Sequence, residues 1–146
     1  MAAQAMPDGY ILAFDFGKRR IGVAVGQSLT GTATALTVIA NGDQPDWAGI
    51  SRLVKEWKPG LFVIGLPLSL DGEETPISGL ARQFGKELKK RYGVDSEFQD
   101  ERLTSVDAER EFAQMRAAGG ARKKDSAMLD AVAAKIILEN WLNTNP

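Results

Sequence analysis

The chain has 146 residues and a formal net charge of -1 at pH 7, with 44% hydrophobic and 25% charged residues. This length holds one globular domain with a core of its own and leaves no room for a second catalytic domain. Cysteine and histidine are both absent, which excludes disulfides, thiol nucleophiles, Cys-based zinc sites and histidine general bases.

The N-terminal stretch "MAAQAMPDG" has neither a basic region nor an apolar run, so it does not resemble a signal peptide. The longest apolar runs are too short to span a membrane. We therefore expect a cytoplasmic protein with no membrane partner. We expect a single domain over residues 1–146, with residues 1–8 flexible.

Three strands open the predicted fold, because apolar and β-branched runs alternate with turn residues at 10–16, 20–27 and 32–39. The short Gly17-Lys18-Arg19 connection predicts a hairpin between the first two. Asp46 is the predicted N-cap of a helix over 47–57, which Pro59-Gly60 ends. The continuous apolar run "LFVIGLPL" at 61–68 is typical of a buried parallel strand.

The second half of the chain alternates helix and strand, at residues 77–92 (helix), 94–100 (strand), 104–118 (helix) and 126–142 (helix). Thr104 and Asp107 form a capping-box pattern, and Gly119-Gly120 begins a flexible basic loop. In the preceding loop, Ser69 and Asp71 are predicted to form a turn. The order predicts an α/β fold whose five-stranded sheet begins with three antiparallel strands.

Asp15 interrupts the first apolar strand. Strand alternation places it on the same face as Ile11 and Ala13, while Phe14 and Phe16 point to the other face. An unpaired carboxylate in such a strand is costly, so it requires a metal, a cation or hydrogen-bond donors. Capping the adjacent glycine turn is the open alternative.

Asp130 lies on the core-facing stripe of the last helix. At 100° per residue, its neighbours on that face are Ala127, Ala133, Ala134, Ile137, Leu138 and Trp141. The alanines allow the helix to approach the sheet closely, which brings this carboxylate towards the strand ends. Asp125 is the predicted N-cap, and pairing of Asp130 with an Arg or Lys is the alternative to a functional role.

A third acidic position lies in "FQDERLTS". Strand alternation groups Asp100 with Val94 and Phe98 and groups Glu101 with Glu97. Alternation alone favours Asp100 as the inward carboxylate. Because alternation fails at strand ends, the choice between Asp100 and Glu101 stays open at this point.

Because the chain lacks histidine and cysteine, carboxylates are its strongest candidates for metal ligands. They suit magnesium or manganese, which prefer oxygen ligands. Basic residues are bunched at 18–20, at 86–91 and at 122–124. The first and third clusters flank the candidate carboxylates, which favours contacts with phosphates. The middle cluster lies near a helix end and is best interpreted as a solvated face.

Four segments together resemble the YqgF family: "FDFGKRRIGVAVG", "VIGLPLSLDG", "DERLTS" and "LDAVAAKIILENWL". This family contains nucleases similar to Holliday junction resolvases, also proposed to mature pre-16S rRNA, with the RNase H-like fold of RuvC. The segments occur in the family's order and span nearly the whole chain. The resemblance implies an RNase H-like mixed sheet with helices on both faces.

The resemblance also implies that Asp15, Glu101 and Asp130 are the catalytic residues and the ligands of one or two Mg²⁺ or Mn²⁺ ions. The chain departs from the family in the spacer "KKDSAMLD", where the lysines stand further upstream than is common. Asp125 is therefore a second candidate ligand. Residues expected to bind nucleic acid are Lys18, Arg19, Arg20, Arg102, Arg122, Lys123 and Lys124; for Arg102, a structural ion pair is the equal alternative.

The sequence thus predicts a metal-dependent nuclease, with the 5′ end of pre-16S rRNA in ribosome biogenesis as the preferred substrate. The alternatives are a Holliday junction resolvase acting on branched DNA and a non-catalytic RNA-binding factor in ribosome assembly. Symmetric junction cleavage favours a homodimer, whereas rRNA processing is compatible with a monomer. An ATPase-like nucleotide binder lacks a P-loop, since "GLARQFGKE" has the wrong spacing.

Overall fold

A computed structural model describes residues 9–67, 69, 71–101 and 128–144. The strands are β1 (Tyr10–Phe16), β2 (Arg20–Gln27), β3 (Thr32–Ala40), β4 (Leu61–Leu66) and β5 (Ser96–Asp100). The helices are α1 (Trp47–Trp57), α2 (Pro76–Tyr92) and α4 (Leu129–Thr144). The helix expected at 104–118, the basic loop after it and the N-terminal residues 1–8 lie outside the described residues.

The five strands form one mixed sheet in the order β3-β2-β1-β4-β5. β1 pairs antiparallel with β2, and β2 pairs antiparallel with β3. β1 pairs parallel with β4, and β4 pairs parallel with β5. The predicted antiparallel start is therefore confirmed, and the run predicted as a parallel strand at 61–68 forms one at Leu61–Leu66, with β1 at the centre of the sheet.

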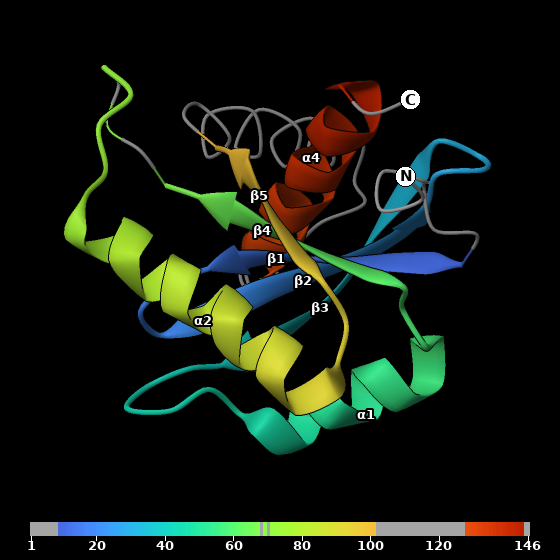
Figure 1. The fold of residues 1–146 in the computed structure, drawn as a ribbon, viewed down its shortest axis with the longest axis horizontal. Coiled ribbons are helices and arrows are strands. Elements are labelled where there is room, and N and C mark those ends of the chain that lie inside the picture. Colours follow the sequence, from blue (N-terminus) through green and yellow to red (C-terminus); the bar gives the residue numbers. More distant parts are fainter. Residues whose placement is uncertain (1–8, 68, 70, 102–127, 145–146) are drawn as a thin grey trace.

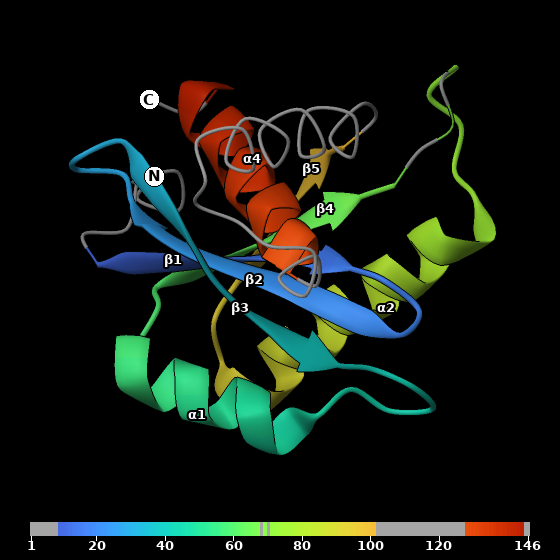
Figure 2. The same ribbon diagram turned by 180° about the vertical axis from the view of Figure 1, so that it is seen from behind.

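Helices cover both faces of the sheet. Figures 1 and 2 show α4 on one face and α1 and α2 on the other. The alternation of β1 divides the core accordingly, since Leu12 and Phe14 belong to the cluster beneath α1 and α2. Ile11 and Ala13 instead pack with Ile137 of α4. Within the described part of the chain, no helix is both long and apolar enough to cross a membrane.

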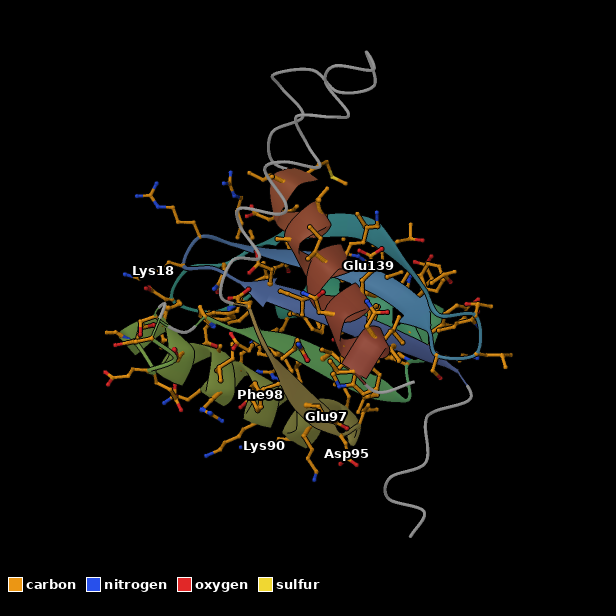
Figure 3. All side chains as sticks on the ribbon, turned by 90° about the horizontal axis from the view of Figure 1, so that it is seen from above. Lys18, Lys90, Asp95, Glu97, Phe98 and Glu139 are labelled. Atoms are coloured by element: carbon orange, nitrogen blue, oxygen red, sulfur yellow. The ribbon has the colours of Figure 1, made fainter. Side chains whose placement is uncertain are left out.

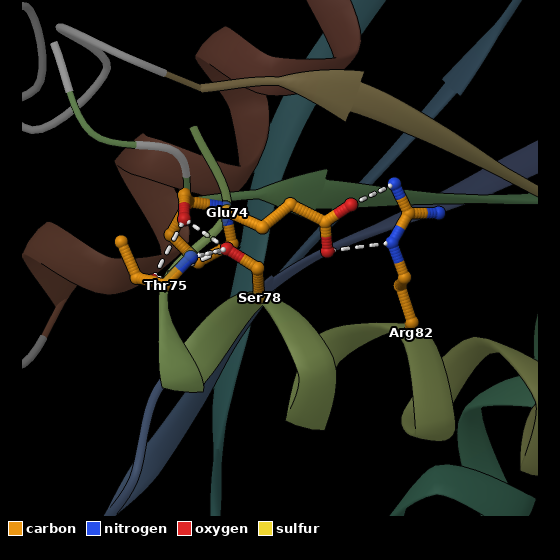
Figure 4. Close-up of polar contacts among 5 residues, drawn as sticks. Glu74, Thr75, Ser78 and Arg82 are labelled. Atoms are coloured by element: carbon orange, nitrogen blue, oxygen red, sulfur yellow. Dashed lines mark hydrogen bonds and ion pairs between the residues drawn. The ribbon is translucent and has the colours of Figure 1, made fainter. Parts of the chain in front are cut away.

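The ends of the helices follow local sequence signals. The Asp46 carboxylate accepts a hydrogen bond from the Gly49 amide at 3.1 Å, which caps α1 as expected. At the start of α2, the Thr75 amide donates to Ser78 Oγ at 2.9 Å, and the buried Ser78 hydroxyl donates to the carbonyl of Pro67 (Figure 4). Ser78 thereby ties the first turn of α2 to the end of β4.

Element boundaries differ from the prediction by one to three residues; α4, predicted over 126–142, spans Leu129–Thr144. β4 ends at Leu66 because the next residue, Pro67, has no backbone N–H to donate to the ladder. β5 begins at Ser96 instead of residue 94. There Val94 packs against the core, and pairing with β4 starts at Ser96 opposite Phe62.

Glycines on the face of the sheet towards α4 allow the helix to approach closely. A Cβ atom at Gly22 would overlap the backbone carbonyl of Asp130, and one at Gly26 would lie 2.8 Å from Leu138 Cδ2. Glycine inside a strand commonly marks such a close approach. The first turn of α4 is therefore seated directly on β2.

We expect Gly22→Ala to destabilise the protein by at least about 2 kcal/mol, because the methyl group has no space beneath α4 and must displace its backbone. Gly79→Ala is the matched control, since a Cβ at Gly79 meets nothing within 4 Å. As Gly79 lies inside α2, alanine there should stabilise the protein by about 0.5–1 kcal/mol. Urea denaturation of both variants checks this prediction, and equal stabilities would contradict it.

Candidate active site

Three elements bring carboxylates to one edge of the sheet. Asp15 is next to last in β1, Glu101 directly follows β5, and Asp130 is the second residue of α4. Because β1, β4 and β5 run parallel, their carboxyl ends meet at the same edge. The first turn of α4 lies over this edge, since its backbone at Asp130 packs on Gly22, the partner of Asp15 in the sheet.

Glycine flanks Asp15 on both neighbouring strands. Gly22 pairs with it on β2, and on β4 the residue before Gly65 pairs with Phe14. A Cβ atom at Gly65 would lie 2.7 Å from Glu101 Oε2. The glycines thus leave space for the Asp130 backbone on one side of Asp15 and for the Glu101 side chain on the other.

Asp15 and Glu101 are hydrogen-bonded to each other. Burial raises the pKa of Asp15, the hydrogen bond from Glu101 lowers it in part, and the charge of Asp130 raises it further. The resulting pKa is about 6. Burial and the charge of Asp15 raise the pKa of Glu101 to about 9. At neutral pH the pair therefore holds one proton on Glu101, which donates to the Asp15 carboxylate.

Asp130 lies beside Arg20. Arg20 Nε is 2.9 Å from Asp130 Oδ2, with side chains 58% and 28% exposed. The two atoms are close enough for an ion pair but do not have hydrogen-bond geometry, and buried Oδ2 has no hydrogen-bond partner among the described residues. The alternative in which Asp130 pairs with an arginine is therefore present in the structure, but it leaves one buried oxygen unsatisfied.

The turn-capping alternative for Asp15 is wrong. The amide of Gly17 donates to the carbonyl of Arg20 at 2.9 Å, and the Asn41 side-chain amide donates to the carbonyl of Gly17 at 2.7 Å. These contacts hold the hairpin turn without Asp15. The carboxyl of Asp15 instead pairs with Glu101.

The inference that favoured Asp100 over Glu101 is also wrong, although the alternation behind it is correct. Gly65 pairs with Gln99, so Glu97, Gln99 and Glu101 share the face towards α4. The Trp141 indole of α4 donates to Glu97 at 3.2 Å, which confirms this face. Helices cover both faces of the sheet, so an apolar face alone does not identify the face of the carboxylates. Phe98 lies on the face towards α1 and α2, whereas Asp15 lies on the face towards α4.

The donor set fits a hard divalent cation. It consists of carboxylate oxygens, it concentrates negative charge, and it includes the unsatisfied Oδ2 of Asp130. Within the described residues, no three acidic side chains already surround a single point as metal ligands do. Binding of an ion therefore requires the Asp15–Glu101 hydrogen bond to open and its proton to leave.

The remaining predicted residues divide into two groups. Lys18, Arg19 and Arg20 are exposed around the β1–β2 hairpin, while Arg102, Arg122, Lys123, Lys124 and Asp125 lie outside the described residues. In the middle cluster, Lys89 pairs with Asp95 at 3.1 Å, which fits the predicted surface role. Ser69 and Asp71 are hydrogen-bonded in a turn, as predicted.

Sequence reasoning missed the two glycines beside Asp15. The segments "RIGVAVGQ" of β2 and "LFVIGL" of β4 contained the signal, because glycine inside a strand indicates close approach by another group. Only the alanines of the last helix were interpreted as allowing a close approach. The contact between helix and sheet depends on small residues on both sides.

The mixed five-stranded sheet with helices on both faces is the RNase H-like fold. Solved structures with this fold include "T. thermophilus RuvC in complex with Holliday junction substrate", with a TM-score of 0.55, 15% identity, and coverage of 92% of this chain and 94% of that one. The yeast mitochondrial Holliday junction resolvase Ydc2 matches with a TM-score of 0.53, 10% identity, and coverage of 96% and 80%.

The chain belongs to the RuvX family, described as Holliday junction resolvase, which matches residues 9–144. Proteins of Yersinia pestis (strain Pestoides F) and Yersinia pseudotuberculosis (strain YPIII) are both named "Putative pre-16S rRNA nuclease". Each is 48% identical over 139 residues, covering 94% of this chain and 97% of the relative. The resemblance to the YqgF family is confirmed, and these findings support a nuclease, a hydrolase acting on nucleic acid.

We expect the metal-free protein to lose stability as the pH rises from about 4 to 9. In this range the folded chain keeps protons on Asp15 and Glu101 that the unfolded chain releases near their ordinary pKa values of 3.8 and 4.5. Asp15→Asn removes the Asp15 contribution. In EDTA, the Tm of wild type should therefore fall relative to that of the variant by a few degrees between pH 5 and pH 8. A difference in Tm that stays constant with pH would contradict this.

Proposed function

We propose that the protein is a metal-dependent nuclease whose catalytic centre consists of Asp15, Glu101 and Asp130. The observation that carries the proposal is the meeting of three carboxylates from β1, the end of β5 and α4 at one edge. Two of them share a proton, and one oxygen of the third accepts no hydrogen bond from any described residue. Such an arrangement destabilises the metal-free protein, because like charges repel and buried carboxylates lose hydration. A bound cation reverses both effects.

Asp15, Glu101 and Asp130 would hold one or two Mg²⁺ or Mn²⁺ ions. When bound, such ions lower the pKa of the attacking water and stabilise the leaving oxygen of a phosphodiester. Glu101 must release its proton for all three carboxylates to act as ligands. Arg20, beside Asp130 and largely exposed, is placed to take a phosphate of the substrate, with Lys18 and Arg19 next to it on the hairpin.

The preferred substrate is the 5′ end of pre-16S rRNA, processed in the cytoplasm during ribosome biogenesis. The names of the relatives that are 48% identical support this choice. The family description supports a second candidate, cleavage of four-way DNA junctions. Junction cleavage requires a two-fold dimer to cut symmetrically, whereas rRNA processing does not.

Asp15→Asn and Asp130→Asn should each reduce Mn²⁺-dependent cleavage by about 100-fold or more, because loss of a ligand forfeits several kcal/mol of transition-state stabilisation. Glu139→Gln, on the same helix as Asp130 (Figure 3), is the matched control and should retain activity. The assay compares labelled pre-16S rRNA with a four-way DNA junction.

Cleavage of one substrate by wild type and by Glu139→Gln, lost in both Asn variants, would support the site and identify the substrate. Full activity of Asp15→Asn would reject the site. Mn²⁺ should also raise the Tm of wild type but not of Asp15→Asn, a measurement independent of activity. RNA binding without cleavage, unaffected by metal or by Asp15→Asn, would instead indicate a non-catalytic assembly factor.

Arg20→Gln should change metal and RNA binding in opposite directions. Loss of the cation beside Asp130 should tighten Mn²⁺ binding, while loss of a phosphate contact should weaken RNA binding. Each change should be about two- to five-fold, because exposed ion pairs contribute up to about 1 kcal/mol. Calorimetry with Mn²⁺ and RNA filter binding in EDTA measure the two effects, and a change in the same direction would contradict the prediction.

A further inference from the structure

A pocket of about 560 Å³ lies on the face of the sheet opposite the carboxylates. It is lined by the β1–β2 hairpin, the segment 41–45 between β3 and α1, the first residue of α1 and one side of α2. Its volume falls within the range of small-molecule sites. Of the residues that line it, the site proposed above uses only Lys18.

The apolar wall of this pocket is formed by Phe16, Trp47 and Leu80. Leu80 is 44% exposed, unusually so for a large apolar side chain in this structure. A ligand with an apolar surface would cover it. Aromatic rings and their flat stacking partners are the preferred surfaces for nucleobases in single-stranded nucleic acids.

Trp47 is held in a stack of flat groups. Its ring lies 5.7 Å from that of Phe84 at an interplanar angle of 28°, and Arg91 Cζ lies 4.0 Å from its centroid. Glu87 fixes the guanidinium, since Arg91 Nε donates to its carboxylate at 2.8 Å. The Arg91 side chain is nevertheless 40% exposed. The wall is therefore ordered before any ligand arrives, which reduces the entropic cost of binding a flat ring.

Amide side chains supply the polar groups of the pocket. The Gln44 carbonyl accepts from the Trp47 indole at 3.3 Å, which leaves its NH₂ group directed to other partners. Gln83 lines the pocket from an exposed position on α2. An amide offers both donors and acceptors, as do the edges of nucleobases.

Charge limits the ligand to one with few phosphates. Lys18 and Arg91 line the pocket together with Asp43 and Glu87, so the charges balance. A polyphosphate would face two carboxylates. A single phosphate is repelled less than a polyphosphate, and Lys18 on the exposed hairpin offers it a cation.

β1 connects this pocket to the carboxylate edge. Asp15 faces α4, whereas the next residue, Phe16, faces the pocket. Lys18 follows on the turn between β1 and β2 and lines the pocket. A polynucleotide strand that leaves the carboxylates can therefore pass around the hairpin and reach the pocket. Two nearby positions along one strand could then be held on the two faces of the sheet.

We propose that this pocket binds one unpaired nucleotide of the substrate, with its base against Phe16, Leu80 and the Arg91 guanidinium that covers Trp47, its polar edge at Gln83 and its phosphate at Lys18. This inference rests on the proposed function, because it assumes a nucleic-acid substrate at the adjacent carboxylates. It adds a specificity determinant, namely a requirement for unpaired nucleotides beside the cleavage site.

The test measures binding of a trinucleotide with 2-aminopurine at its centre, by fluorescence in EDTA, to the full chain. Lys18→Ala and Gln83→Ala should each weaken binding about three- to ten-fold, with unchanged Tm. Lys90→Ala is the matched control, because it removes a positive charge from the exposed side of α2 without lining the pocket (Figure 3). It should bind as wild type does.

Cleavage is measured separately, on substrates with and without a single-stranded extension. Gln83→Ala should raise KM for the extended substrate alone. Absent trinucleotide binding by wild type, or equal binding by wild type and Gln83→Ala, would overturn the inference while leaving the nuclease proposal intact, because Lys18 also serves the carboxylate site and Gln83 does not. Binding that depends on Lys18 and Gln83 in a protein that cleaves nothing would support the pocket and reject the nuclease.

Discussion

The structure depends on the seating of α4 against β2 at Gly22. A side chain there would overlap the Asp130 carbonyl, so the first turn of the helix can lie at this height only above glycine. The contact sets the position of Asp130 relative to Asp15, the partner of Gly22 in the sheet. Protein interiors are close-packed, so a shift of the α4 backbone at this contact would displace neighbouring residues as well. The same contact at Gly22 therefore determines both how α4 packs on the sheet and where Asp130 lies relative to Asp15.

The packing that brings the three carboxylates to this edge is opposed by their mutual repulsion and by the cost of burying them. Burial and mutual repulsion keep a proton between Asp15 and Glu101 at neutral pH. Among the described residues, Oδ2 of Asp130 has an ion pair with Arg20 but no hydrogen bond. The core clusters on both faces of the sheet offset this cost through buried apolar surface. A cluster of this kind is typical of functional sites, which store instability that a ligand relieves. Arg20 serves as a partial, surface-exposed substitute for that ligand.

Much of this arrangement could be predicted from periodicity. Strand alternation assigned Asp15 to the correct face, and helical spacing placed Asp130 on the side of α4 that meets the sheet, with Ile137 and Leu138 in the core as expected. The position of Glu101 could not be predicted in this way, because alternation identifies two faces but does not say which neighbouring strand shares one with Asp15. That information lies in the pairing of β4 with β5. The pocket was also beyond prediction, since it joins residues from three segments far apart in the sequence.

The alternation of β1 has a consequence for how the chain tolerates insertions. Asp15 and Phe16 serve opposite faces, and neighbouring strands fix their pairing residue by residue. One residue inserted upstream within β1 would exchange the two faces, placing an aromatic ring among the carboxylates and a carboxylate against the aromatic wall. Both sites would be lost together, although every existing residue would still be present. Variation in length is therefore excluded from this strand and confined to the segments that connect it to others.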